Sequence, residues 1–166
     1  MSNNISKVPI AVNEPILSYR PGSKEKKEVL EEYKTLLENP VEIKMRIGDK
    51  DVKTGDTSLM CPPHDHQHKL GFYHKANKKN IQTAIDCALE AKKKWSKMPW
   101  ESRAAIFLKA ANLVAGPYRY KINAATMIAQ SKTIYQAEID AACEFIDFLR
   151  FNVQFMRDIY EKQPEN

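Results

Sequence analysis

The chain has 166 residues, the length of one domain, and its hydrophobic fraction of 43% and charged fraction of 28% are typical of a globular protein. This composition excludes collagen-like, low-complexity and strongly disordered chains, and no apolar run approaches the roughly 20 residues of a membrane span. The net charge of +5 arises before residue 101, where 18 basic side chains face 13 acidic ones. Because stacking aromatics do not alternate with these lysines, we interpret them as solvated and predict no nucleic-acid site.

The amino-terminal part predicts an extended arm followed by a helix. Residues 1–21 contain three prolines, which exclude a continuous helix. Ser23 is a typical N-cap, and apolar residues at helical spacing follow it. Asn39 and Pro40 end this first helix.

Two segments have strand character. Apolar and polar residues alternate over residues 41–47, which predicts a half-buried strand. Gly48 and Asp49 then favour a turn, so that residues 51–53 return as the second strand of a hairpin. Residues 69–74 predict another short strand.

The rest of the chain is dominated by helical patterns. Apolar spacing predicts helices near 77–94, at 100–115 and at 120–129, and a last helix from Thr133 to about Tyr160. This last helix would be on the order of 40 Å long. Its apolar positions cover more than one stripe, so we expect another chain segment to cover them.

Residues 61–68 contain five side chains that metal ions accept as ligands, namely Cys61, His64, Asp65, His66 and His68. Alternating side chains of an extended segment point to opposite faces, and two prolines stiffen the chain beside the cysteine. We therefore favour a polar turn over a preformed zinc site, with the metal site as the alternative.

The three cysteines are widely spaced and odd in number, which argues against a disulfide framework and fits a reducing compartment. A nucleophilic thiolate needs a nearby cation or a helix N-terminus. Cys143 instead stands among Asp140, Glu144 and Asp147, and Cys87 stands among apolar residues. Both are predicted to be buried or half-buried thiols, and no catalytic residue is assigned.

A dinucleotide-binding turn requires closely spaced glycines that let the backbone approach a phosphate. This sequence offers no such pair, since its glycines are Gly22, Gly48, Gly55, Gly71 and Gly116. We therefore assign no cofactor-binding residue.

Four carboxylates on the last helix form the remaining candidate site, namely Glu138, Asp140, Glu144 and Asp147. Steps of four and three residues place the last three on one face of a regular helix. Spacing alone favours a solvated acidic stripe.

Three segments carry a family resemblance: NEPILSYRPGS at Asn13–Ser23, SRAAIFLKAANLVAGPYR at Ser102–Arg119 and KTIYQAEIDAACEFIDFLRFN at Lys132–Asn152. They resemble the amino-terminal region of the delta-1-pyrroline-5-carboxylate dehydrogenases, a family of aldehyde dehydrogenases that act in proline catabolism. The resemblance covers residues 12–164, whereas members of the family are much longer.

The resemblance implies an α/β fold of the aldehyde dehydrogenase type, of which this segment is mostly α-helical with a short β-hairpin near 41–53. Residues 22–166 would be the amino-terminal part of the cofactor domain, which remains incomplete. The implied activity is NAD-dependent oxidation of L-glutamate gamma-semialdehyde to L-glutamate. In the family, the glutamate that matches Glu144 faces the amino group of the substrate.

The resemblance further implies a mitochondrial matrix enzyme that forms homo-oligomers when full length, although residues 1–20 are a poor match to a transit peptide. Because neither a nucleophile motif nor a cofactor loop is present, this chain alone is expected to be inactive and not to bind NAD. The alternative is a non-catalytic truncated relative, which would act as a binding or assembly subunit through its uncovered apolar surface.

Overall fold

The structure is a computed structural model that describes residues 7–162 of the chain. The arm precedes a helix, five short strands and a series of further helices. In chain order the elements are α1 (Lys24–Glu38), β1 (Val41–Ile43), β2 (Met45–Ile47), β3 (Lys50–Val52), β4 (Thr57–Met60), β5 (Gly71–His74), α2 (Lys78–Trp95), α3 (Trp100–Ala115), α4 (Arg119–Gln130), α5 (Ile134–Ala137), the π-helix η1 (Glu138–Cys143) and α6 (Glu144–Lys162).

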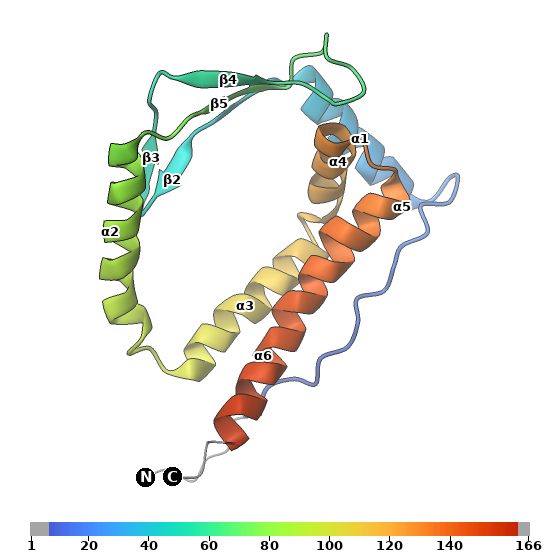
Figure 1. The fold of residues 1–166 in the computed structure, drawn as a ribbon. Helices are drawn as coiled ribbons and strands as arrows, with labels where there is room; N and C mark the ends of the chain where they lie inside the picture. The colour runs from blue at the N-terminus through green and yellow to red at the C-terminus, as the bar shows by residue number, and fades with distance from the viewer. Residues whose placement is uncertain (1–6, 163–166) are drawn as a thin grey trace.

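The helices α3 and α6 run side by side, and α4 leads from them to α1 (Figure 1). Two small apolar clusters hold this layer together. One joins α3 to η1 and α6 through Ala111, Val114, Ala142 and Ile146. The other joins the arm to α1 and α4 through Tyr19, Val29 and Ala124.

The strands form two small sheets, and the strand predicted at 69–74 is present as β5. The expected strand at 41–47 is divided: β2 and β3 form the hairpin, whereas β1 pairs in parallel with β5. The order of the larger sheet is β1-β5-β4. Local alternation gave no indication of β4, or of a parallel pairing between strands about thirty residues apart.

Gly71 explains why β1 and β5 come so close. Its φ of +134° lies in a region that favours glycine, and a Cβ atom there would stand 1.9 Å from the carbonyl oxygen of Val41. The parallel pairing therefore depends on the absence of a side chain at this position.

The predicted helices are confirmed within a few residues. Ser23 caps α1 by accepting a hydrogen bond from the backbone of Lys26. The long last helix is also present, but it is interrupted by η1, where the backbone takes the wider π-helical turn.

The helix α2 stands apart from the α3 and α6 pair (Figure 1), and none of its residues is buried. Its apolar ridge is left open, with Ile81, Ile85 and Leu89 each about half exposed or more. None of the helices within residues 7–162 combines the length and apolar character needed to cross a bilayer.

Candidate functional site

The described part of the arm runs antiparallel to the last helix and is fixed to it by backbone hydrogen bonds. Three amides spaced three residues apart donate to helix side chains: Ala11 to Gln154 at 2.8 Å, Glu14 to Asp147 at 2.7 Å and Leu17 to Glu138 at 2.8 Å. A repeat of three residues is the period of a polyproline II helix. The arm is therefore aligned with the helix at three points.

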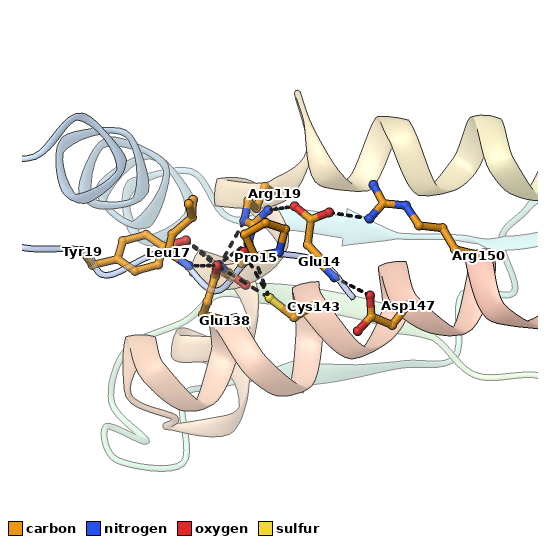
Figure 2. Close-up of polar contacts among 10 residues, drawn as sticks. Glu14, Pro15, Leu17, Tyr19, Arg119, Glu138, Cys143, Asp147 and Arg150 are labelled. Carbon is orange, nitrogen blue, oxygen red and sulfur yellow. Dashed lines mark hydrogen bonds and ion pairs between the residues drawn. The ribbon is translucent and has the colours of Figure 1, made fainter. Parts of the chain in front are cut away.

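A buried ion-pair network anchors this arrangement. Figure 2 shows Arg119 joined to Glu138 on one side and to Glu14 on the other. The guanidinium also donates to the carbonyl of Pro15 at 2.8 Å. Glu138 is fully buried and accepts further hydrogen bonds of 2.7 Å from Tyr19 and from Asn123.

The electrostatics of the network favour its charged form. Burial acts to raise the pKa of Glu138, but the hydrogen bonds from Arg119, Tyr19, the Leu17 amide and Asn123 outweigh it and hold that pKa below its usual value. Burial also acts to lower the pKa of Arg119, yet its two carboxylate partners raise it overall. A fully paired buried charge of this kind is costly to disrupt.

The π-helical segment explains how Glu138 reaches this network. Asp147 and Gln154 are seven residues apart, two turns of a regular helix, and so share a face. Glu138 lies nine residues before Asp147, which in a regular α-helix would rotate it by about 180° to the opposite side. The wider turn of η1 absorbs one residue and reduces this rotation to about 80°.

Glu138 was thus wrongly grouped with a solvated acidic stripe. Asp147 also differs from that expectation, because it accepts hydrogen bonds of 2.7 Å from both the Asn13 side chain and the Glu14 amide. Asp140 is exposed and pairs with Lys132 at 2.6 Å. The four carboxylates therefore have different roles. Glu138 and Asp147 bind the arm, Asp140 forms a surface ion pair, and Glu144 is the one whose surroundings remain to be described.

Glu144 lies in an open groove of about 470 Å³ between the arm and α6. Among the residues that the structure describes, its exposed carboxylate has no hydrogen-bond or ion-pair partner. The groove is lined by Asn13, Glu144, Asp147, Phe148, Phe151, Asn152 and Phe155.

The lining of the groove favours a cation. It combines two carboxylates with three phenyl rings, and no basic side chain lies among the lining residues. Carboxylates attract an ammonium group directly, and aromatic faces add a cation–π contribution. Asp147 already accepts one hydrogen bond on each oxygen, whereas all acceptor positions of Glu144 are open among the described residues, so Glu144 is the carboxylate more available to such a group.

The other candidate residues have structural partners. Residues 61–68 form turns, as predicted: His64 shares a hydrogen bond with Ser131, and His68 shares one with the Leu37 carbonyl. Within residues 7–162, no three His, Cys, Asp or Glu side chains are grouped to hold a metal ion. Cys143 is buried as predicted, and burial raises its pKa to about 11.

Sequence reasoning did not find the network around Arg119. Glu14 and Arg119 stand in the NEP and PYR pieces of the segments that carry the family resemblance, but no spacing rule relates residues 105 positions apart. Tyr19 and Asn123 likewise gave no local signal. Only the fold brings the arm, α4 and η1 together.

Comparison with known proteins agrees with this architecture. Residues 52–166 match the aldehyde dehydrogenase family. The chain belongs to this family. Among curated relatives, the delta-1-pyrroline-5-carboxylate dehydrogenase of Agaricus bisporus is 45% identical, over 95% of this chain and 29% of that protein. The protein of that name from Dictyostelium discoideum, described as mitochondrial, is 41% identical over 95% of this chain and 28% of its own length.

Solved structures show the same likeness. The delta-pyrroline-5-carboxylate dehydrogenase of Mycobacterium tuberculosis, bound with NAD and cobalamin, matches with a TM-score of 0.95 and 42% identity, over 100% of this chain and 31% of that chain. A point mutant of the Thermus thermophilus 1-pyrroline-5-carboxylate dehydrogenase matches with a TM-score of 0.86 and 26% identity, over 97% of this chain and 31% of its own. The chain thus spans under a third of the length of these relatives, and its fold is that of the aldehyde dehydrogenases.

Proposed function

We propose that this chain is the amino-terminal segment of an NAD-dependent dehydrogenase that oxidises L-glutamate gamma-semialdehyde to L-glutamate in proline catabolism. The observation that carries the substrate assignment is the carboxylate of Glu144, which has no partner within residues 7–162 and lies in an aromatic, acidic groove. The substrate has a cationic amino group, and such a group needs a carboxylate when it enters a shielded site. The names of the relatives support the same substrate class.

The cofactor is assigned to the longer enzyme rather than to this chain. NAD, when bound, accepts a hydride from the substrate. None of the five glycines forms a closely spaced pair, so these residues do not fit a phosphate-binding turn. We therefore derive no step through NAD here and propose that the 166-residue chain alone neither binds NAD nor oxidises aldehydes.

Partners and location follow from the same proposal. The open ridge of α2 and the exposed apolar residues of α6 outside the groove, including Phe145 and Ile159, would be covered by the remainder of the enzyme. The full-length protein would form homo-oligomers. Relatives from Dictyostelium discoideum and Homo sapiens are named as mitochondrial, which supports the mitochondrial matrix.

A second candidate function is a non-catalytic binding or assembly subunit. The half-exposed ridge of α2 favours it, because a surface of this kind marks a protein–protein contact. Under this alternative, the carboxylate of Glu144 would have no effect on aldehyde oxidation in any complex that contains the chain.

Substitution of Glu144 tests the substrate assignment. In a full-length protein that carries this segment, Glu144→Gln is expected to lower kcat/KM for glutamate semialdehyde by roughly ten- to hundredfold, since a hydrogen bond to a charged group contributes about 1.5–3 kcal/mol. Simple aldehydes without an amine should be largely unaffected. Asp140→Asn is the matched control, since Asp140 lies in the adjoining η1 and outside the groove. Equal losses for both classes of aldehyde would mean that Glu144 supports the fold instead.

A further inference from the structure

The groove holds two carboxylates, yet they differ in their availability to a ligand. Asp147 accepts the Glu14 amide on Oδ1 and the Asn13 side chain on Oδ2, each at 2.7 Å. Both donors belong to the arm. Glu144, on the same wall of the groove, has no such donor among the described residues.

We infer that Asn13 is a specificity-determining positioning residue, which occupies Asp147 and thereby makes Glu144 the carboxylate to which the substrate ammonium binds. This inference rests on the proposed function. Asn13 acts through Asp147 and needs no contact of its own with the substrate. Its side-chain amide donates to the oxygen atom that would otherwise be open to an ammonium group.

The position of Asn13 is fixed by its neighbours in the chain. The carboxylate of Glu14 bridges Arg119 at 2.5 Å and Arg150 at 2.6 Å, and both ion pairs are largely shielded from solvent (Figure 2). Arg119 also holds the carbonyl of Pro15. Residues on the carboxyl side of Asn13 are therefore clamped, so its amide stays against Asp147.

The consequence for binding is a change in position rather than a simple loss of affinity. An ammonium group placed at Glu144 is held at one end of the groove, and the rest of the substrate is oriented from that point. If Asn13 were removed, Oδ2 of Asp147 would lose its donor and could accept the ammonium group instead. The groove would then have two competing sites for the same charge.

A double-mutant cycle tests this inference in the full-length protein. We expect Glu144→Gln to lower kcat/KM for glutamate semialdehyde by about tenfold or more in the native background, and by about threefold or less in an Asn13→Ala background, where Asp147 substitutes for Glu144. When Asp147→Asn is also present beside Asn13→Ala, Glu144→Gln should again lower kcat/KM by about tenfold or more, because no second carboxylate can replace Glu144. A simple aldehyde, measured in parallel, should show no such coupling.

The outcomes separate this inference from the proposed function. Equal losses in both backgrounds would overturn the role of Asn13 and leave the contact between Glu144 and the ammonium group intact. No loss for Glu144→Gln in the native background would overturn that contact, and the inference with it.

Hydrogen exchange supplies a readout of the arm itself. In the Asn13→Ala variant, the amides of Ala11, Glu14 and Leu17 should remain protected, because their acceptors on the helix are unchanged. If all three amides lost protection together, Asn13 would hold the arm in place rather than select a carboxylate, and the inference would be wrong.

Discussion

Glu138 is the residue on which the described part of the arm most depends. It is fully buried and accepts hydrogen bonds from the arm and from Arg119 and Asn123 of α4. We expect Glu138→Gln to destabilise the chain by about 1.5–3 kcal/mol, the usual contribution of a hydrogen bond to a charged group, because Arg119 keeps its ion pair with Glu14. Asp140→Asn, which disrupts a surface pair two residues away, should cost less than about 1 kcal/mol. Urea denaturation of both variants checks this, and equal losses would contradict it.

The lowered pKa of Glu138 also predicts a pH dependence. A carboxyl whose pKa is depressed in the folded state stabilises that state above its unfolded value of about 4.3, and this contribution is lost as the pH falls through the folded value. The difference in unfolding free energy between the native chain and Glu138→Gln should therefore be constant above about pH 5 and shrink below about pH 4. A difference that stays constant down to about pH 2 would argue against the charged network.

For single residues, some structural roles could be predicted from the sequence and others could not. The buried thiol of Cys143 and the cap at Ser23 follow from local chemistry and were predicted. The burial of Glu138 was missed because a regular α-helix was assumed, and the hydrogen bonds to Asp147 were missed because their donors come from the distant arm. The phase of that helix depends on η1, and nothing in a periodic apolar pattern marks a single π-helical turn.

Among the elements, the parallel pair of β1 and β5 has the sharpest requirement. We expect Gly71→Ala to destabilise the chain by at least about 3 kcal/mol, because the new Cβ would overlap the Val41 backbone and the φ of +134° is strained for alanine. Gly55→Ala is the matched control. Its φ is also positive, at +78°, but a Cβ there meets nothing within 4 Å, so its cost should be about 1–2 kcal/mol. Thermal unfolding of the two variants compares them, and similar losses would refute the steric explanation.

The helices were predictable because each has its own periodic pattern and end signals. The limits of α3 match the predicted ones, and the limits of α2 and α4 differ from the predicted ones by about one residue. The sheets were less predictable, since pairing between β1 and β5 is decided by contacts across about thirty residues of chain. Short strands such as β4 have too few residues for alternation to be informative.

At the scale of the whole molecule, α2 presents an apolar ridge without cover in the described structure. The 166-residue chain should therefore bind a hydrophobic fluorescent probe and self-associate. Ile85→Lys is expected to reduce both signals while changing the unfolding free energy by less than about 0.5 kcal/mol, since no residue of α2 is buried. Light scattering and probe fluorescence measure this. A probe-silent monomer before any substitution would contradict the prediction.

We propose that this segment belongs to a glutamate semialdehyde dehydrogenase in which other residues supply the cofactor site and the nucleophile. The most direct test compares NADH formation from glutamate semialdehyde and NAD by a full-length protein that carries the segment and by the 166-residue chain alone. We predict steady NADH production by the full-length protein and none by the chain. A full-length protein that oxidises simple aldehydes but not the semialdehyde, or a chain that turns over by itself, would contradict the account.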